Sequence, residues 1–143
     1  MNIAQLTAHR SAADIVTCDS ASPIRDAVAI IAEKRIGALP VMDGGRVVGI
    51  FSERDVIYRV AASGGACLDQ TVGEAMTSPA ITVSPQTSVD EALSLMTRRR
   101  IRHLPVMDGE TMCGFISIGD LVKSRMDEVQ QEANAMRDYI ATS

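Results

Sequence analysis

A seven-residue stretch that occurs twice decides the fold of this chain: it reads GIFSERD at residues 49–55 and GFISIGD at residues 114–120. Both copies follow the pattern Gly-apolar-apolar-Ser-x-x-Asp and lie 65 positions apart, from 49 to 114. At this offset residues 36–55 align with residues 101–120 without a gap, and half of the aligned positions carry the same residue. Such a match indicates an internal duplication, so the chain is two copies of one unit.

The residues around the duplicated stretch predict the same order of elements in both units. In the first unit we expect a strand over 14–17, a helix that starts at residues 20–23, strands over 38–42 and 46–51, and a helix over 52–63. In the second unit we expect a short helix over 72–76, a strand over 80–83, a helix through 89–96, strands over 103–107 and 111–116, and a helix from 117 to near the end. Gly37 is expected to let the chain turn out of the first helix.

On this pattern the chain divides into five segments. They are an N-terminal arm or short helix at 1–13, the first repeat at 14–66, a linker with a short helix at 67–78, the second repeat at 79–126 and a helical extension at 127–143. A repeat of about 60 residues would be marginally stable alone, so we expect the two copies to pack against each other. The apolar stripe of the last helix, from Leu121 to Ile140, suits contact with a second subunit.

Composition places the chain among globular proteins with an aliphatic core. Of its 143 residues, 46% are hydrophobic but only 3% are aromatic, and the net charge is −4. This charge argues against binding of nucleic acid or anionic membrane over the whole surface. No stretch reaches the roughly 20 apolar residues of a membrane-spanning helix, and no signal pattern opens the chain, so we expect a cytoplasmic location. Three cysteines without metal-ligand spacing and only two histidines predict no metal site.

The ordered set of motifs resembles the CBS-domain family. It comprises Leu-Pro-Val-Met-Asp-Gly at 39–44, its near copy at 104–109, the Gly-x-x-Ser-x-x-Asp that follows each, and their tandem arrangement over about residues 14–126. Two such copies form what is called a CBS pair or Bateman module. The resemblance implies an α+β fold of two tandem β-α-β-β-α repeats, related by pseudo-twofold symmetry and packed sheet to sheet with the helices outside. It also implies a homodimer, and adenosine-containing ligands in clefts between the repeats.

The two Ser-x-x-Asp corners, Ser52 with Asp55 and Ser117 with Asp120, have two interpretations. As capping boxes, their side chains would only satisfy free backbone N–H groups at a helix start. The same N–H groups and the positive end of the helix also attract a phosphate. The family resemblance implies that the aspartates accept hydrogen bonds from ribose hydroxyls, that the serines lie nearer the phosphate, and that a residue near the first strand, here Thr17 or Thr82, lies close to the adenine ring.

Basic residues distinguish the two repeats. Arg102 and His103 stand at the entry to a strand, where the resemblance implies contact with phosphates, whereas the first repeat has Gly37 and Ala38 at these positions. We therefore expect unequal clefts, in which the first repeat lacks a phosphate contact or takes it from Arg54, Arg59 or the other repeat. The residues expected to bind ligand are Thr17, Ser52, Arg54, Asp55, Thr82, Arg102, His103, Ser117 and Asp120.

These features predict a regulatory module that binds AMP, ADP, ATP or NAD(H), catalyses nothing and reports to a protein partner that the chain does not encode. AMP and NAD(H) rank first, because the resemblance extends to small CBS-pair proteins that bind them. An S-adenosyl compound fits the adenosine part but would leave Arg102 without a phosphate. The motifs GxxxxGK[ST], GxGxxG, HExxH and GxSxG are absent, which makes a hydrolase or transferase the weakest class. Two alternatives stay open: a dimerisation scaffold with empty clefts, and a nucleic-acid binder that uses the basic run 98–102, whose binding would fall steeply with salt.

Overall fold

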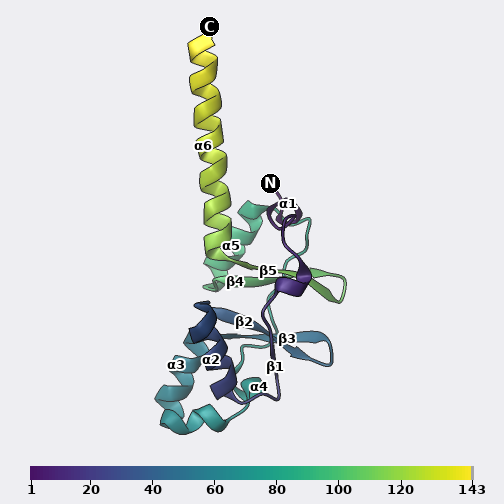
Figure 1. Ribbon diagram of the computed structural model, residues 1–143, viewed down its shortest axis with the longest axis vertical. Coiled ribbons are helices and arrows are strands. Elements are labelled where there is room, and N and C mark those ends of the chain that lie inside the picture. The colour runs from purple at the N-terminus through teal and green to yellow at the C-terminus, as the bar shows by residue number, and fades with distance from the viewer. Residues whose placement is uncertain (143) are drawn as a thin grey trace.

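The structure is a computed structural model that describes residues 1–142, and Figure 1 shows two stacked units with one long helix projecting from them. The elements in chain order are α1 (Ile3–Leu6), η1 (Ala12–Asp14), β1 (Cys18–Asp19), α2 (Ile24–Lys34), β2 (Ala38–Asp43), β3 (Arg46–Ser52), α3 (Glu53–Ser63), η2 (Gly64–Asp69), α4 (Val72–Ala75), α5 (Val89–Arg99), β4 (His103–Asp108), β5 (Thr111–Ser117) and α6 (Ile118–Thr142). One sheet has the order β1-β2-β3 and the other pairs β4 with β5. The sheets meet through β3 and β5, with helices on the outer sides, which confirms the predicted α+β fold.

The two hairpins repeat one another residue by residue. In the first, Ala38 pairs with Ser52 and Val41 with Gly49; in the second, His103 pairs with Ser117 and Val106 with Gly114. Each hairpin shifts register one residue after its paired valine, and each turn contains a glycine with positive φ. The duplicated stretch therefore fixes both register and twist, so each hairpin delivers its serine to the start of a helix in the same way.

The first strand of each repeat is shorter than the sequence predicts. A strand was expected over 14–17, but residues 12–14 form a single 3-10 turn and the strand β1 covers only Cys18–Asp19, parallel to β2. The strand expected over 80–83 is reduced to one parallel bridge between Val83 and Val106. The backbone on both entry segments is therefore mostly free of the sheet, which leaves it available to line a cleft.

The helices α2 and α5 each have an arginine as the C-cap residue. Arg35 follows α2 with φ 53°, and Arg100 follows α5 with φ 55°, so each adopts the left-handed conformation of a helix C-cap. The turn out of α2 was predicted at Gly37, two residues too late. Both arginines occupy the same place in the duplication, 65 positions apart, so the two repeats share an unfavourable cap of the same kind.

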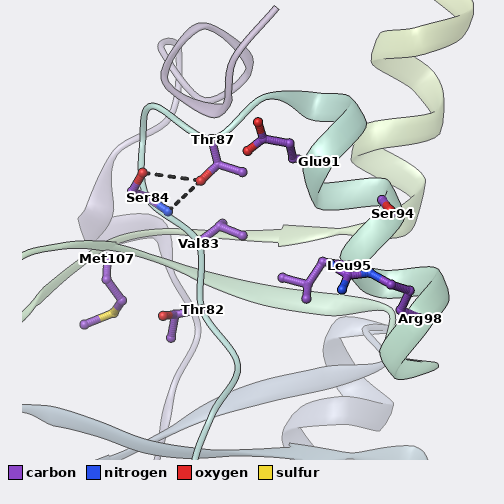
Figure 2. Close-up of a pocket in the computed structure, with 9 residues that line it drawn as sticks. All are labelled: Thr82, Val83, Ser84, Thr87, Glu91, Ser94, Leu95, Arg98 and Met107. Carbon is purple, nitrogen blue, oxygen red and sulfur yellow. Dashed lines mark hydrogen bonds between the residues drawn. The ribbon is translucent and has the colours of Figure 1, made fainter.

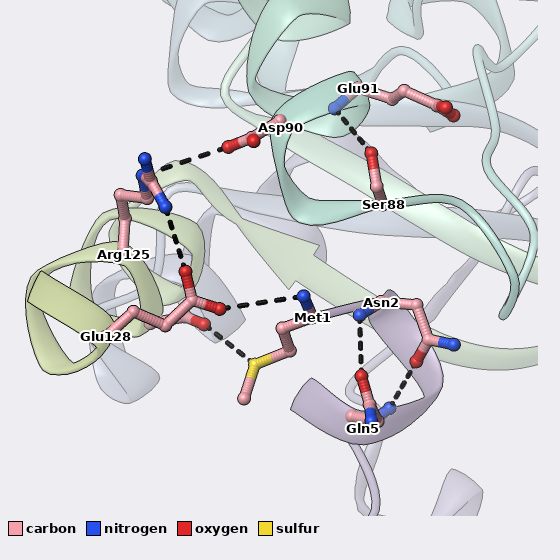
Figure 3. Close-up of polar contacts among 9 residues, drawn as sticks. Met1, Asn2, Gln5, Ser88, Asp90, Glu91, Arg125 and Glu128 are labelled. Carbon is pink, nitrogen blue, oxygen red and sulfur yellow. Dashed lines mark hydrogen bonds and ion pairs between the residues drawn. The ribbon is translucent and has the colours of Figure 1, made fainter. Parts of the chain in front are cut away.

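The N-terminal arm packs on the second repeat, although the first repeat follows it in sequence. Ile3 is fully buried in the core of the second unit, and the backbone N–H of Ile3 donates to Thr87 at 2.9 Å. Figure 3 shows the arm beside the base of α6, with the Asn2–Gln5 capping box at the start of α1. The first unit is closed in turn by η2 and α4, since Cys67 and Val72 are fully buried.

The final helix α6 runs without a break for 25 residues. Its first turns pack on α5 and β5 through Leu121 and Ser124, which are buried. Among the described residues, no helix combines the length and apolar character needed to cross a membrane.

Candidate functional site

Two clefts lie between the repeats, and each contains one Ser-x-x-Asp corner. We call them the Asp55 cleft and the Asp120 cleft, with volumes of about 560 and 440 Å³. Each corner lies where a hairpin strand passes directly into a helix, so the carboxylate stands in the first helical turn. Free backbone N–H groups and the positive end of a helix are present at both places. The clefts are therefore equivalent in architecture, and their differences lie in the side chains.

In the Asp55 cleft the carboxylate is buried and accepts three hydrogen bonds. Asp55 is 7% exposed, and one of its oxygens accepts the Ser52 backbone N–H at 2.9 Å and the Ser52 hydroxyl at 3.1 Å. The other oxygen accepts the hydroxyl of Thr77 at 3.0 Å. Thr77 is held in place by two backbone hydrogen bonds with Ile50 on β3, of 3.0 and 2.8 Å. The Asp55 carboxylate thus has a neutral partner that the fold positions rigidly.

In the Asp120 cleft the carboxylate is bonded to a cation from the N-terminal arm. Both guanidinium nitrogens of Arg10 donate to the two Asp120 oxygens, at 2.8 and 3.2 Å, in a paired fork. The Ser117 backbone N–H donates to the same carboxylate at 2.9 Å. Burial alone would raise the pKa of Asp120, but the hydrogen bonds from Arg10 and Ser117 and the charge of Arg10 outweigh it, so this pKa lies below its usual value.

His103 forms a wall between the two clefts and lines both of them. Its ring stacks on Phe115 with centroids 5.6 Å apart and an interplanar angle of 13°. A side chain on Gly37 would start 3.1 Å from the His103 ring, so the small residue at 37 makes room for the imidazole. Burial lowers the pKa of His103, although the charges of Asp120 and Glu53 oppose that shift. The ring is therefore biased toward its neutral form.

The structure distributes the predicted site residues over both clefts and beyond them. Ser52, Arg54, Asp55 and Arg102 line the Asp55 cleft, Ser117 and Asp120 line the other, and His103 lines both. Arg102 of the second repeat therefore lies in the cleft that contains the corner of the first repeat, together with Arg54 of the first repeat. Arg54 also crosses between repeats, since its guanidinium donates to the Arg100 carbonyl at 3.0 Å.

The two threonines expected near an adenine ring do not line either cleft. Thr82 lines a separate hollow of about 670 Å³ on the outer side of the second repeat, shown in Figure 2 with Thr87, Glu91 and Arg98. Thr17 is exposed and lines none of the three cavities described here. The outer hollow contains neither corner, so its residues are not part of the paired arrangement.

Several cleft residues escape prediction from the sequence. Apolar residues just before the short first strands line the clefts: Ile15 and Val16 in the Asp120 cleft, Ala80 and Ile81 in the Asp55 cleft. The two pairs align with each other at the 65-residue offset, and they lie one and two positions before Thr17 and Thr82. The duplication could therefore have identified them. Arg10 gives no comparable signal, because it lies 110 positions from Asp120 in the chain.

Comparison with known proteins identifies the repeats. The family model described as "CBS domain" matches residues 9–62 and again residues 72–127. The mitochondrial CBS domain-containing protein CBSX3 of Arabidopsis thaliana is 36% identical over 128 residues, which cover 86% of this chain and 62% of that relative. The chain therefore spans less than two thirds of this relative's length.

Solved structures show the same arrangement. A protein with CBS domains from Burkholderia ambifaria is 40% identical, with a TM-score of 0.82, over 89% of this chain and 95% of that one. A CBS-domain-containing protein from Agrobacterium tumefaciens is 36% identical, with a TM-score of 0.81, over 87% of this chain and 92% of that one. Both similarities extend over most of this chain and nearly the whole of the solved one.

Proposed function

Since this chain belongs to the CBS-domain family, we propose that it is a regulatory module that binds adenosine-containing ligands in the two clefts between its repeats and catalyses no reaction. One observation carries the proposal: each cleft combines a helix-start carboxylate with an apolar strip from the opposite entry segment. The carboxylates of Asp55 and Asp120 can accept hydrogen bonds from vicinal ribose hydroxyls. The strips, Ala80-Ile81 and Ile15-Val16, offer apolar contact to a flat base.

Other proteins with this fold support the ligand class. CBSX2 has been solved in complex with AMP, and the CBS domain pair of protein MJ0100 in complex with 5-methylthioadenosine and S-adenosyl-L-methionine. Each is 23% identical to this chain, so the similarity to these two proteins concerns the fold alone. The inosine-5'-monophosphate dehydrogenase of Mycobacterium leprae, an enzyme, matches this chain over only 22% of its own length. A CBS pair therefore occurs beside catalytic machinery that this chain does not match.

The cations favour a phosphate-bearing ligand in the Asp55 cleft. Arg54, Arg99 and Arg102 all line it, and Arg102 is exposed. AMP, ADP, ATP or NAD(H) would place phosphates among these guanidinium groups, whereas an S-adenosyl compound would leave them without an anion. AMP and NAD(H) remain our first choices. We further propose a homodimer in the cytoplasm that reports ligand occupancy to another protein.

A dimerisation scaffold is the second candidate, because one observation favours it. Both carboxylates already have partners within the chain: Ser52 and Thr77 for Asp55, Ser117 and Arg10 for Asp120. Under this alternative the corners act as capping boxes only, and substitution of an aspartate costs about 1 kcal/mol of stability without any effect on binding. Nucleic-acid binding through residues 98–102 is a weaker alternative, since the net charge of the chain is −4.

Thermal unfolding of nucleotide-stripped protein tests the proposal. The ligands are adenosine, AMP, ADP, ATP, NAD, NADH, S-adenosyl-L-methionine, GMP and a short RNA, applied to the wild type and to the variants Asp55→Ala and Asp120→Ala. A ligand at about 100 times its Kd should add about 2.7 kcal/mol and raise the Tm by several degrees. We expect adenine compounds but not GMP to raise it, with loss in the matching variant. Equal Tm values with all compounds would contradict the proposal and favour the scaffold.

A further inference from the structure

The outer half of α6 is exposed over its whole described length, residues 129–142. Figure 1 shows this part as a rod that projects beyond the two repeats. Residues 129–142 extend about 20 Å at the rise of an α-helix. Isolated helices of this length are marginal in water, so a persistent helix here needs a surface to pack against.

Apolar side chains along α6 recur at alternating spacings of four and three residues. They are Val122, Met126, Val129, Ala133, Met136 and Ile140. This is the a and d pattern of a two-stranded coiled coil, with Met126, Ala133 and Ile140 at a and the other three at d. In the single chain Val122, Met126, Val129 and Met136 are 43%, 65%, 53% and 59% exposed, so this stripe is not used for packing on the repeats.

The base of α6 leaves the stripe accessible. Leu121 and Ser124 are the buried residues of this helix, so a different side of it faces the repeats. Figure 3 shows Arg125 at the base, bonded to Glu128 at 3.0 Å and 3.9 Å from Asp90. The pair with Asp90 joins the base of α6 to α5, and neither contact involves a residue of the stripe.

We propose that the α6 helices of two copies of this chain pair in parallel as a two-stranded coiled coil. In a parallel pair, position g of one helix faces position e of the next heptad on the other helix. Glu132 is at g and Arg137 is at e, so Glu132 of each copy faces Arg137 of the other copy. A fully overlapped antiparallel pair would instead place Glu132 opposite Glu132 and Lys123 opposite Arg137. Charge complementarity therefore selects the parallel arrangement, which sets equivalent ends of the two copies side by side.

Site-directed crosslinking tests the pairing and its direction. Met136→Cys is made in a Cys113→Ser background, because Cys113 is exposed whereas Cys18 and Cys67 are buried. A parallel coil places residue 136 opposite itself, so air oxidation should give a disulfide-linked dimer in high yield. The matched control Gln131→Cys, in the same background, lies at the outer position f and should give at least tenfold less. Equal yields at the two positions, or no dimer at 136, would overturn the proposal.

Charge substitutions give a second readout, by sedimentation equilibrium of the full chain. Val129→Glu introduces a charge into the seam and should weaken self-association at least tenfold, whereas Gln131→Glu adds the same charge outside the seam and should leave it unchanged. Glu132→Arg and Arg137→Glu should each weaken it, and the double variant should recover the wild-type constant. Wild-type behaviour of Val129→Glu, or additive weakening in the double variant, would overturn the parallel coil.

Discussion

The two clefts use the same carboxylate at the same helix start but give it different partners. Asp55 is bonded to Thr77, a neutral hydroxyl that two backbone hydrogen bonds attach to β3. Asp120 is bonded to Arg10, a long cationic side chain from the N-terminal arm. Each carboxylate accepts three hydrogen bonds, two at one oxygen and one at the other, so the clefts differ in the charge of the partner and not in the number of bonds. A ribose hydroxyl that approaches Asp55 therefore meets a neutral neighbour, whereas one that approaches Asp120 competes with an ion pair.

The difference arises in the segments that precede each repeat. Thr77 pairs with Ile50 as an isolated antiparallel bridge, and within the described chain the equivalent Phe115 has no such bridge. Without that backbone pairing, the arm is free to approach Asp120 through a side chain. A duplicated sequence can thus give two sites with unequal ligand preferences when only the flanking segments differ.

The largest difference is expected at the glycines that begin the duplicated stretch. A methyl group on Gly49 would lie 2.7 Å from both the Met76 sulfur and the Thr77 carbonyl oxygen, whereas one on Gly114 would lie 3.3 Å from Val106. Because one neighbour of Gly49 is backbone, Gly49→Ala should cost about 2–3 kcal/mol of unfolding free energy. Gly114→Ala should change it by less than about 1 kcal/mol. Urea unfolding measures both, and equal losses would show that the bridge at Thr77 is not rigid.

The second prediction concerns the ion pair in the Asp120 cleft. Arg10→Ala removes two of the three hydrogen bonds that Asp120 accepts, so adenosine, which has no phosphate, should bind this cleft about fivefold more tightly, corresponding to an ion pair of about 1 kcal/mol. Calorimetric titration in an Asp55→Ala background isolates the cleft. Arg46→Ala is the matched control, since Arg46 pairs with Glu110 on the surface at 3.3 Å. Weaker adenosine binding in Arg10→Ala would mean that Arg10 contacts the ligand instead.

The same variant has a pH signature. The pKa of Asp120 is lowered in the folded protein, so its ion pair contributes full stability at neutral pH, above the pKa of the unfolded carboxyl. That contribution is lost as the pH falls through the lowered pKa. The difference in unfolding free energy between wild type and Arg10→Ala should therefore be largest at neutral pH and should disappear in acid. A pH-independent difference would show that Arg10 acts through packing rather than charge.

The third prediction addresses the neutral partner of Asp55. Thr77→Val keeps the shape of the side chain but removes the hydroxyl that donates to Asp55, so it should cost about 1 kcal/mol. The effect stays modest because Asp55 keeps its two bonds from Ser52. Urea unfolding measures the loss, with Thr82→Val as a matched control outside the clefts. A loss no greater than that of the control would mean that Thr77 holds the site through its backbone alone.

How far the sequence predicts these features depends on how local each one is. The hairpins and the Ser-x-x-Asp corners follow from adjacent residues and are present as expected. The first strand of each repeat was misplaced because so little of it joins a sheet. In the first repeat only Cys18 and Asp19 form a strand, and in the second repeat only Val83 forms a bridge. The turn out of α2 was misplaced because Arg35 adopts a backbone conformation that usually favours glycine.

The composition of each cleft could not be read from one repeat alone. Pseudo-twofold packing brings the strand entry of one repeat against the corner of the other, so Arg102 lies with Asp55 rather than with Asp120. The contact of Arg10 with Asp120 depends on the course of the whole arm, which passes over the second repeat before the chain enters the first. Such contacts depend on tertiary structure, and no local pattern encodes them.

The smallest predicted effect concerns His103, the residue that the two clefts share. Burial lowers the pKa of His103 in the folded protein, so the unfolded chain binds the proton more readily, and stability should fall as the pH drops below about 6.5. His103→Gln should remove this dependence, as followed by urea unfolding between pH 5 and 8, with His9→Gln as the control.

Protonation of His103 would also add a cation to both clefts. AMP, but not adenosine, should therefore bind more tightly to the wild type than to His103→Gln at pH 5.5, and equally well to both at pH 7.5; comparing the two proteins at one pH cancels the protonation of the AMP phosphate, whose second pKa is about 6. If adenosine also bound more tightly at pH 5.5, the pH response would come from the carboxylates Asp55 and Asp120, with their unequal partners, and not from His103.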